Sequence, residues 1–287
     1  MSALRSVFVE ANGVRQHALT TEGDRGPVLL LHGYLDLART FTRALAALEA
    51  SGWKVYALDL RGHGETDRAP AGGYYHAYDY VADVDAAVDA LGLARFHLVG
   101  HSMGGGVATR YAAARPERLL SLSLLEGVGP PAMPAEVAPD RTLAWLDGLK
   151  RARSRSPKRM ATLDDVVTRM RVAHPTVPAE VLREVAAWSV REAEGGWEFR
   201  FDPLHQTTSP GRYDAEGFEA TVARVKAPTL LVDGGGDMSQ WPEFGARARR
   251  YPVARTVTLD GAGHMMHWTQ PTELARTLAE FFAEREA

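Results

Sequence analysis

The 287-residue sequence contains no cysteine. The fold therefore cannot depend on disulfides, and neither a thiolate nucleophile nor a cysteine-ligated metal site is available. Any catalysis must use oxygen and imidazole groups, and the chain has ten histidines. We expect no metal and no cofactor.

The sequence also lacks a long hydrophobic run. No apolar stretch approaches the ~20 residues that span a bilayer, and residues 1–10 lack the apolar stretch of a signal peptide. We therefore expect a cytoplasmic protein without a membrane partner. The overall composition, with 45% hydrophobic and 24% charged residues, is that of an ordinary globular protein.

Neither sign of charge is in large excess, since 33 basic residues face 36 acidic ones and the formal net charge is −3. Nucleic-acid binding needs a clustered cationic surface, so nucleic acid is not an expected partner. The one dense basic run covers residues 150–159. We interpret it as a solvated loop, with recognition of an anionic partner or a substrate carboxylate as the alternative.

The pattern of apolar residues predicts an α/β fold. Alternating runs at 7–9 and 14–19 flank Asn12-Gly13, which is typical of a hairpin with a type I′ turn. Short apolar strands then alternate with amphipathic helices, which indicates a mostly parallel central sheet with helices on both faces. Strands are expected at 27–31, 54–58, 96–99, 119–125, 228–232 and 255–259, and helices at 39–50, 80–91, 104–115, 243–251 and 271–284.

The alternation of apolar strands and helices stops between residues 127 and 222, where no strongly apolar strand occurs. Prolines there precede helical patterns around 142–153, 163–172 and 179–192. We interpret residues 127–222 as an inserted helical cap, or lid. Residues 1–126 and 223–287 then form the core. A cap in this place would cover the carboxyl ends of the strands, where open α/β sheets bind ligands.

A serine nucleophile is predicted in Gly100-His101-Ser102-Met103-Gly104, which lies between an expected strand and a Gly/Ala-rich helix. A G-x-S-x-G turn in this setting strains the serine backbone and exposes Oγ above the sheet. Glycine is needed on both sides because a Cβ would collide with the neighbouring strand and helix. A Gly-rich helix start is the alternative interpretation, which the flanking strand and helix disfavour.

A serine hydroxyl needs an imidazole to take its proton and a carboxylate to orient that imidazole. His264 follows the last expected strand and is the candidate base. Asp237 is the first candidate acid, because it gives the chain order Ser, Asp, His. Glu126 at the end of the strand after the nucleophile is the alternative acid, with Asp233 third.

The tetrahedral intermediate also needs hydrogen-bond donors for its oxyanion. The backbone N–H of Met103, at a helix N-terminus directly after the nucleophile, is one candidate. The backbone N–H of Tyr34, in a His-Gly-Tyr turn after an expected strand, is the other.

These segments together resemble the successive signatures of the α/β-hydrolase superfamily. The resemblance is carried by residues 32–36 (HGYLD), 58–64 (LDLRGHG), 100–105 (GHSMGG) and 263–264 (GH), and it covers nearly the whole chain outside the cap. Residues 32–36, 74–75 (YY) and 124–130 (LLEGVGP) are similar, more narrowly, to the serine hydrolase-like group. Asp237 matches the general superfamily pattern, and Glu126 matches the narrower group.

The resemblance implies a serine hydrolase, which we expect to cleave a small to medium carboxylic ester through an acyl-enzyme. A C–C bond hydrolase, a lactonase or a non-catalytic small-molecule-binding homologue is the alternative. Serine at position 102 disfavours dehalogenase and epoxide hydrolase activity, because those enzymes of this fold use an aspartate nucleophile. Trp241, Trp145 and Trp188 are candidates for lining a pocket for an apolar acyl or aryl group. We expect a monomer or a homodimer.

Overall fold

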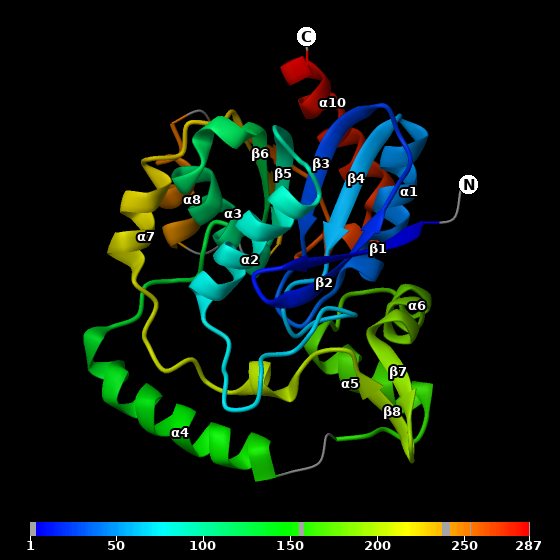
Figure 1. Cartoon of the computed structure of the whole chain (residues 1–287), viewed down its shortest axis with the longest axis vertical. Coiled ribbons are helices and arrows are strands. Elements are labelled where there is room, and N and C mark those ends of the chain that lie inside the picture. The colour runs from blue at the N-terminus through cyan, green and yellow to red at the C-terminus, as the bar shows by residue number, and fades with distance from the viewer. Residues whose placement is uncertain (1–3, 155–157, 237–241, 253, 287) are drawn as a thin grey trace.

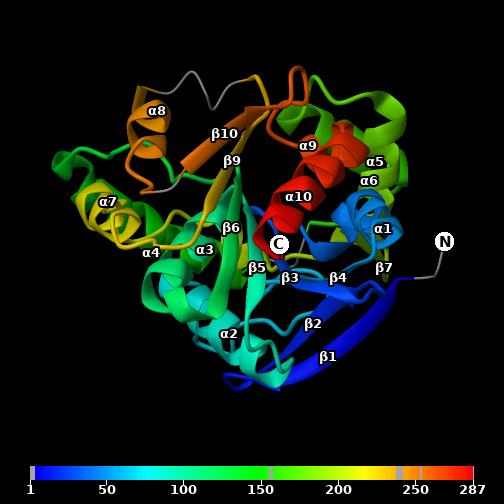
Figure 2. The ribbon, with the colours of Figure 1, turned by 90° about the horizontal axis from the view of Figure 1, so that it is seen from above.

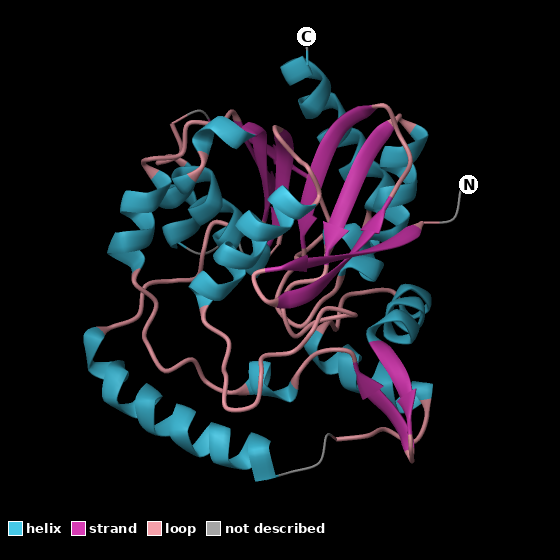
Figure 3. Ribbon diagram, viewed as in Figure 1, coloured by secondary structure: helices cyan, strands magenta, loops and turns pink. Residues whose placement is uncertain are grey.

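The computed structural model describes residues 4–154, 158–236, 242–252 and 254–286. Within them the core is one eight-stranded sheet, in the order β1-β2-β4-β3-β5-β6-β9-β10. Figure 3 shows the strands in magenta and the helices in cyan. The pairs β1/β2 and β2/β4 are antiparallel, and all other neighbours are parallel. The strands are β1 (Arg5–Ala11), β2 (Val14–Thr20), β3 (Arg25–Leu31), β4 (Trp53–Leu58), β5 (Phe96–His101), β6 (Leu119–Leu125), β9 (Thr229–Asp233) and β10 (Ala254–Thr258).

The hairpin that opens the chain is formed as predicted. Asn12 and Gly13 have φ values of 54° and 67°, the left-handed conformation that both central residues of a type I′ turn require. β1 and β2 pair from Arg5 with Thr20 to Ala11 with Val14. The local dipeptide thus sets the register of the antiparallel edge.

Helices cover both faces of the sheet, which confirms the predicted α/β class (Figure 2). One buried cluster joins the sheet to α1 (Thr42–Ala50) and α10 (Pro271–Glu286), and another joins it to α2 (Ala77–Ala90) and α3 (Met103–Ala114). The predicted helix at 39–50 is divided into η1 (Ala38–Phe41) and α1. Two short helices, α8 (Pro242–Ala248) and α9 (Met266–Thr269), complete the core.

Most of residues 127–222 lie beyond the carboxyl ends of the parallel strands, in the lower part of Figure 1. α7 differs, because it packs against α3 and contributes Phe218 and Val222 to the same buried cluster. The division into core and cap stays a prediction. The elements of this segment are η3 (Ala135–Val137), α4 (Ala138–Ser154), α5 (Leu163–Ala173), α6 (Ala179–Ser189), β7 (Val190–Ala193), β8 (Gly196–Phe199), η4 (Pro203–Gln206) and α7 (Ala215–Val222).

The expectation of a helix to residue 192 is wrong, because α6 ends at Ser189 and the chain turns into the β7/β8 hairpin. Glu194 and Gly195 form its turn, and Gly195 and Gly196, the first residue of β8, have φ values of 84° and 136°, which glycine adopts at little cost. No helix of the described residues is both long and apolar enough to span a bilayer.

Two buried histidines should make the fold sensitive to acid. Burial lowers the pKa of His97 and of His205 to about 4 in each case, below the usual value of about 6.5. The unfolded chain therefore binds more protons than the folded chain between about pH 6.5 and 4, and the free energy of unfolding falls as the pH falls through this window. Each histidine contributes up to roughly 3 kcal/mol to this loss.

Urea unfolding at pH 7.5 and 5.0 measures the effect. His97 packs against Trp53 and Phe282, and His97→Gln removes its ionisation. We expect the variant to lose less stability than the wild type between the two pH values. An equal loss in both proteins would contradict the assignment.

Candidate active site

Ser102 sits at a sharp turn between β5 and α3, with φ of 50° and ψ of −115°. A positive φ is uncommon for a residue with a side chain and is a strained conformation typical of functional sites. A Cβ at Gly100 would lie 2.5 Å from the carbonyl oxygen of Gly104, and one at Gly104 would lie 2.5 Å from those of Leu31 and His32. Glycine is therefore required on both sides of the serine, as the sequence analysis expects.

The imidazole of His264 lies between a hydroxyl and a carboxylate. Its Nε2 is 3.1 Å from Ser102 Oγ, and its Nδ1 is 3.3 Å from Glu126 Oε2. With the proton on Nδ1, the ring donates to Glu126 and its Nε2 is free to accept the serine proton. Residues 162 positions apart in the chain thus form one line of proton donors and acceptors.

Glu126 ends β6 at the same edge of the sheet and is 1% exposed. Its φ of 47° is also positive, so the chain turns sharply there as it does at Ser102. Oε1 accepts the backbone N–H of Gly234 at 2.8 Å, while Oε2 faces His264. The carboxylate is therefore held in one orientation by the loop after β9.

Of the other two candidate acids, Asp233 and Asp237, the structure describes only Asp233. Asp233 lies beside Glu126, and burial, followed by the negative charge of Glu126, raises the pKa of Asp233. Its Oδ1 accepts the backbone N–H of Gly235 at 2.8 Å, which fits a role in bracing the loop. Asp237 lies outside the described residues.

The two candidate oxyanion donors flank the serine. Met103 is the first residue of α3, so its N–H has no partner within the helix. The turn with Tyr34 approaches closely, because a Cβ at Gly33 would lie 2.8 Å from His101 Nδ1 and 3.2 Å from Ser102 Cβ. Tyr34 and Met103 line the same cavity as Ser102 and His264.

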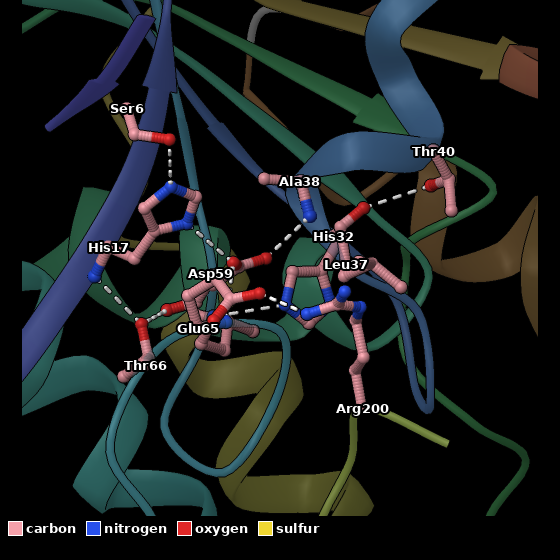
Figure 4. Close-up of polar contacts among 11 residues, drawn as sticks. Ser6, His17, His32, Leu37, Ala38, Thr40, Asp59, Glu65, Thr66 and Arg200 are labelled. Carbon is pink, nitrogen blue, oxygen red and sulfur yellow. Dashed lines mark hydrogen bonds and ion pairs between the residues drawn. The ribbon is translucent and has the colours of Figure 1, made fainter. Parts of the chain in front are cut away.

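A buried carboxylate fixes the loop that carries Tyr34 (Figure 4). Asp59 Oδ1 accepts the backbone N–H of Ala38 at 2.7 Å, and Oδ2 accepts from His17 Nδ1 at 2.7 Å and from the backbone N–H of Glu65 at 3.1 Å. These bonds join the segments after β3 and β4 to β2. Hydrogen bonds within the protein therefore hold the segment that follows Tyr34 in place.

Further histidines support the site without contacting the serine. His101 Nε2 donates to the carbonyl oxygen of His264 at 2.8 Å, and His267 Nε2 donates to Asp36 Oδ2 at 2.9 Å. Burial lowers the pKa of His101 and of His267, so both rings are neutral near pH 7. His267 also stacks on Phe41 at 3.9 Å between ring centroids.

Asp36, His101 and His267 are also close enough to be considered as metal ligands, because one ligand atom from each lies within 4.8 Å of the others. Asp36 is already occupied on both oxygens, by His267 and by the hydroxyl of Thr40 at 2.7 Å. The contacts fit a hydrogen-bonded support for the His264 loop better than a metal site.

A cavity of about 660 Å³ opens over the serine, and Ser102, His264 and Glu126 are part of its wall. Two of the three tryptophans expected to line it, Trp145 and Trp188, are placed elsewhere. Trp145 packs edge-on against Tyr74, which does line the cavity, and Trp188 packs against the buried cluster of α5 and α6. Trp241 lies outside the described residues.

The structure adds wall residues that the sequence analysis did not identify. They include two arginines and several tyrosines: Arg110, Arg141, Tyr74, Tyr75, Tyr80 and Tyr213. The sequence contained one signal that could have identified Arg110. The cavity is lined by Met103, Gly106, Val107 and Arg110. Their spacing is that of one helix face, starting directly after the nucleophile.

Comparison with known proteins agrees with this fold. The model of the alpha/beta hydrolase fold family matches residues 26–271. A hypothetical protein from Pseudomonas aeruginosa PAO1 has a solved structure that superimposes with a TM-score of 0.86 at 28% identity, covering 98% of this chain and 100% of that one.

Three curated relatives show how far the similarity extends. A serine hydrolase-like protein from Danio rerio is 36% identical over 215 residues, which cover 72% of this chain and 64% of that protein. An N-formylmaleamate deformylase from Pseudomonas putida is 29% identical over 91% of this chain and 90% of its own. An epoxide hydrolase from Siraitia grosvenorii is 34% identical, but over only 42% of this chain and 38% of its own.

Proposed function

Because the chain belongs to the α/β-hydrolase family, we propose that it is a serine hydrolase that cleaves a small to medium carboxylic ester through an acyl-enzyme at Ser102. The observation that carries the proposal is the line Ser102, His264, Glu126 at the wall of the cavity. The cytoplasmic location and the monomeric or dimeric state stay predictions.

The reaction begins with proton transfer from the serine. His264 Nε2 accepts the proton of Ser102 Oγ while Oγ attacks the ester carbonyl carbon. Glu126 keeps the Nδ1 proton in place and stabilises the imidazolium that forms. The backbone N–H groups of Tyr34 and Met103 stabilise the negative oxygen of the tetrahedral intermediate.

The intermediate collapses when His264 returns the proton to the leaving alcohol, which leaves the acyl group on Ser102. Water then repeats the sequence: His264 takes a proton from it, the hydroxide attacks the acyl carbon, and Oγ leaves with that proton. The carboxylic acid is released and the serine is restored.

The relatives set the limits of the proposal. Epoxide hydrolases of this fold use an aspartate nucleophile, whereas position 102 is serine. The deformylase aligns along nearly the whole chain, so removal of a formyl group is a second candidate that the same serine would perform. A pure binding protein has no physical need for the complete set of serine, imidazole, carboxylate and oxyanion donors.

Covalent labelling tests the nucleophile. A fluorophosphonate reagent should add one phosphonyl group to Ser102, because the His264 imidazole activates that hydroxyl. Peptide mass spectrometry would locate the adduct. His264→Ala should lose the labelling, and Ser51→Ala, at an exposed serine, should keep it. An adduct on a different residue would disprove the assignment.

A further inference from the structure

We propose that the substrate carries a carboxylate and that Arg110 and Arg141 bind it where the main cavity meets a neighbouring one. The inference rests on the proposed function, since it places this carboxylate relative to the acyl carbon on Ser102. A second cavity of about 400 Å³ adjoins the first, and both arginines line both cavities. Ser102 lines only the first, so the arginines mark the far end of the site.

The guanidinium of Arg110 is within reach of a substrate on Ser102. Arg110 Nη1 donates to the carbonyl oxygen of Gly106 at 2.9 Å, so the side chain folds back along α3 toward the serine. Gly106 is four residues from Ser102, which is ~6 Å along the helix axis. A Cβ at Gly106 would lie 3.4 Å from Nη1, so glycine leaves room for this conformation.

Two aromatic rings orient the guanidinium of Arg110, and most of its N–H groups have no hydrogen-bond partner among the described residues. Its guanidinium carbon lies 4.8 Å from the ring centroid of Phe218 and 5.6 Å from that of Tyr78, which fixes the plane of the group. A guanidinium has five N–H donors, and one is used by Gly106. In the described part of the chain no carboxylate lies within ion-pair distance of Arg110.

Arg141 adds a second cation from α4. Its Nε donates to the carbonyl oxygen of Gly211 at 3.2 Å, and its terminal nitrogens have no recorded partner among the described residues. Arg212 also lines the second cavity, and among the described residues of its wall Asp214 is the only acidic one. Asp214 accepts the N–H of Gly217 at 3.0 Å as the cap of α7. Positive charge therefore dominates this region.

A carboxylate is the anion that this arrangement favours. It is planar and matches the paired N–H groups of a guanidinium, so one arginine can bind both oxygens. The short distance along α3 between Ser102 and Gly106 predicts a chain of a few carbon atoms between the acyl carbon and the carboxylate. A half-ester of a four- to six-carbon dicarboxylic acid has this form.

Two esters of similar length test the inference: mono-p-nitrophenyl adipate, which carries a carboxylate, and p-nitrophenyl hexanoate, which does not. We expect the wild type to hydrolyse the adipate half-ester with at least a tenfold higher kcat/KM. Arg110→Met and Arg141→Met should each lower this preference roughly 10- to 100-fold, the scale of a lost charge-assisted hydrogen bond. Arg151→Met, at an exposed arginine of α4 that lines neither cavity, is the matched control and should keep the wild-type preference.

Equal kcat/KM for the two esters in the wild type would overturn the inference. If the hydrolysis of both esters still depended on Ser102, the proposed function would stand. Loss of Ser102-dependence with both esters would instead refute the proposed function. Calorimetric titration of adipate into the wild type and Arg110→Met separates the cases, because binding needs no turnover. We expect adipate to bind the wild type at least tenfold more tightly, and equal binding to both proteins would overturn the inference.

Discussion

Ser102→Ala should lower kcat for p-nitrophenyl esters by about 10⁵-fold or more, since removing the nucleophile of such a triad leaves only the contributions of the oxyanion donors and substrate binding. The hydroxyl that is lost lies 3.1 Å from His264 Nε2, and no other serine of the described residues bonds to that nitrogen. A p-nitrophenyl ester series of increasing acyl length measures the loss and sizes the pocket in the same experiment.

The double variant Ser102→Ala/His264→Ala is the control for Ser102→Ala. Because members of a triad act as a unit, Ser102→Ala/His264→Ala should be little slower than Ser102→Ala alone. Circular dichroism must show that both variants are folded, which we expect because Ser102 is only partly buried and alanine tolerates the space. Near-normal turnover by Ser102→Ala would rule out the serine mechanism.

The sheet and its helices were predictable because their signals are local. Apolar runs at the predicted strands and the Asn12-Gly13 turn depend on neighbouring residues in the chain, and the structure has each element within a few residues of its expected position. The β7/β8 hairpin was not predicted. Its β8 strand has four residues, Gly-Trp-Glu-Phe, which are too few to show an alternating pattern against the preceding helical pattern.

The site was predictable where a motif carries the chemistry. Ser102 and the turn with Tyr34 follow strands of the sheet, and parallel strands bring their carboxyl ends to one edge, so their closeness follows from topology. The wall of the cavity depends instead on how residues 127–222 fold back over that edge. Trp145 and Arg141 lie one turn apart on the same face of α4, yet only Arg141 reaches the cavity, and a single sequence does not show which turn of that helix meets the cavity.

The second large effect concerns the acid, where we expect Glu126→Gln to lower kcat by about 10⁴-fold, the scale known for neutralising the orienting acid of a serine protease. The variant changes few contacts, because glutamine has nearly the same shape. The backbone N–H of Gly234 donates to Oε1 of residue 126, so the amide oxygen of the glutamine should turn toward Gly234. Its NH₂ group then faces His264 Nδ1.

With the NH₂ group facing Nδ1, the donor and acceptor nitrogens of the His264 ring exchange places. Nδ1 must accept from the NH₂ group, so the proton of the neutral ring moves to Nε2, and Nε2 no longer accepts the proton of Ser102. The loss therefore falls on kcat, with KM nearly unchanged, and the protein stays folded. A loss of stability without a loss of kcat would show that Glu126 only braces the loop after β9.

Asp237→Asn is the matched comparison, because it neutralises the other candidate acid by the same change of one atom. If Glu126 orients His264, as its 3.3 Å contact with Nδ1 supports, Asp237→Asn should keep kcat within a few-fold of the wild type. A 10⁴-fold loss in Asp237→Asn with a mild effect in Glu126→Gln would reverse the assignment. The role of Glu126 would then be to fix the Gly234 turn, and the triad would take its acid from Asp237, which follows β9 in the chain.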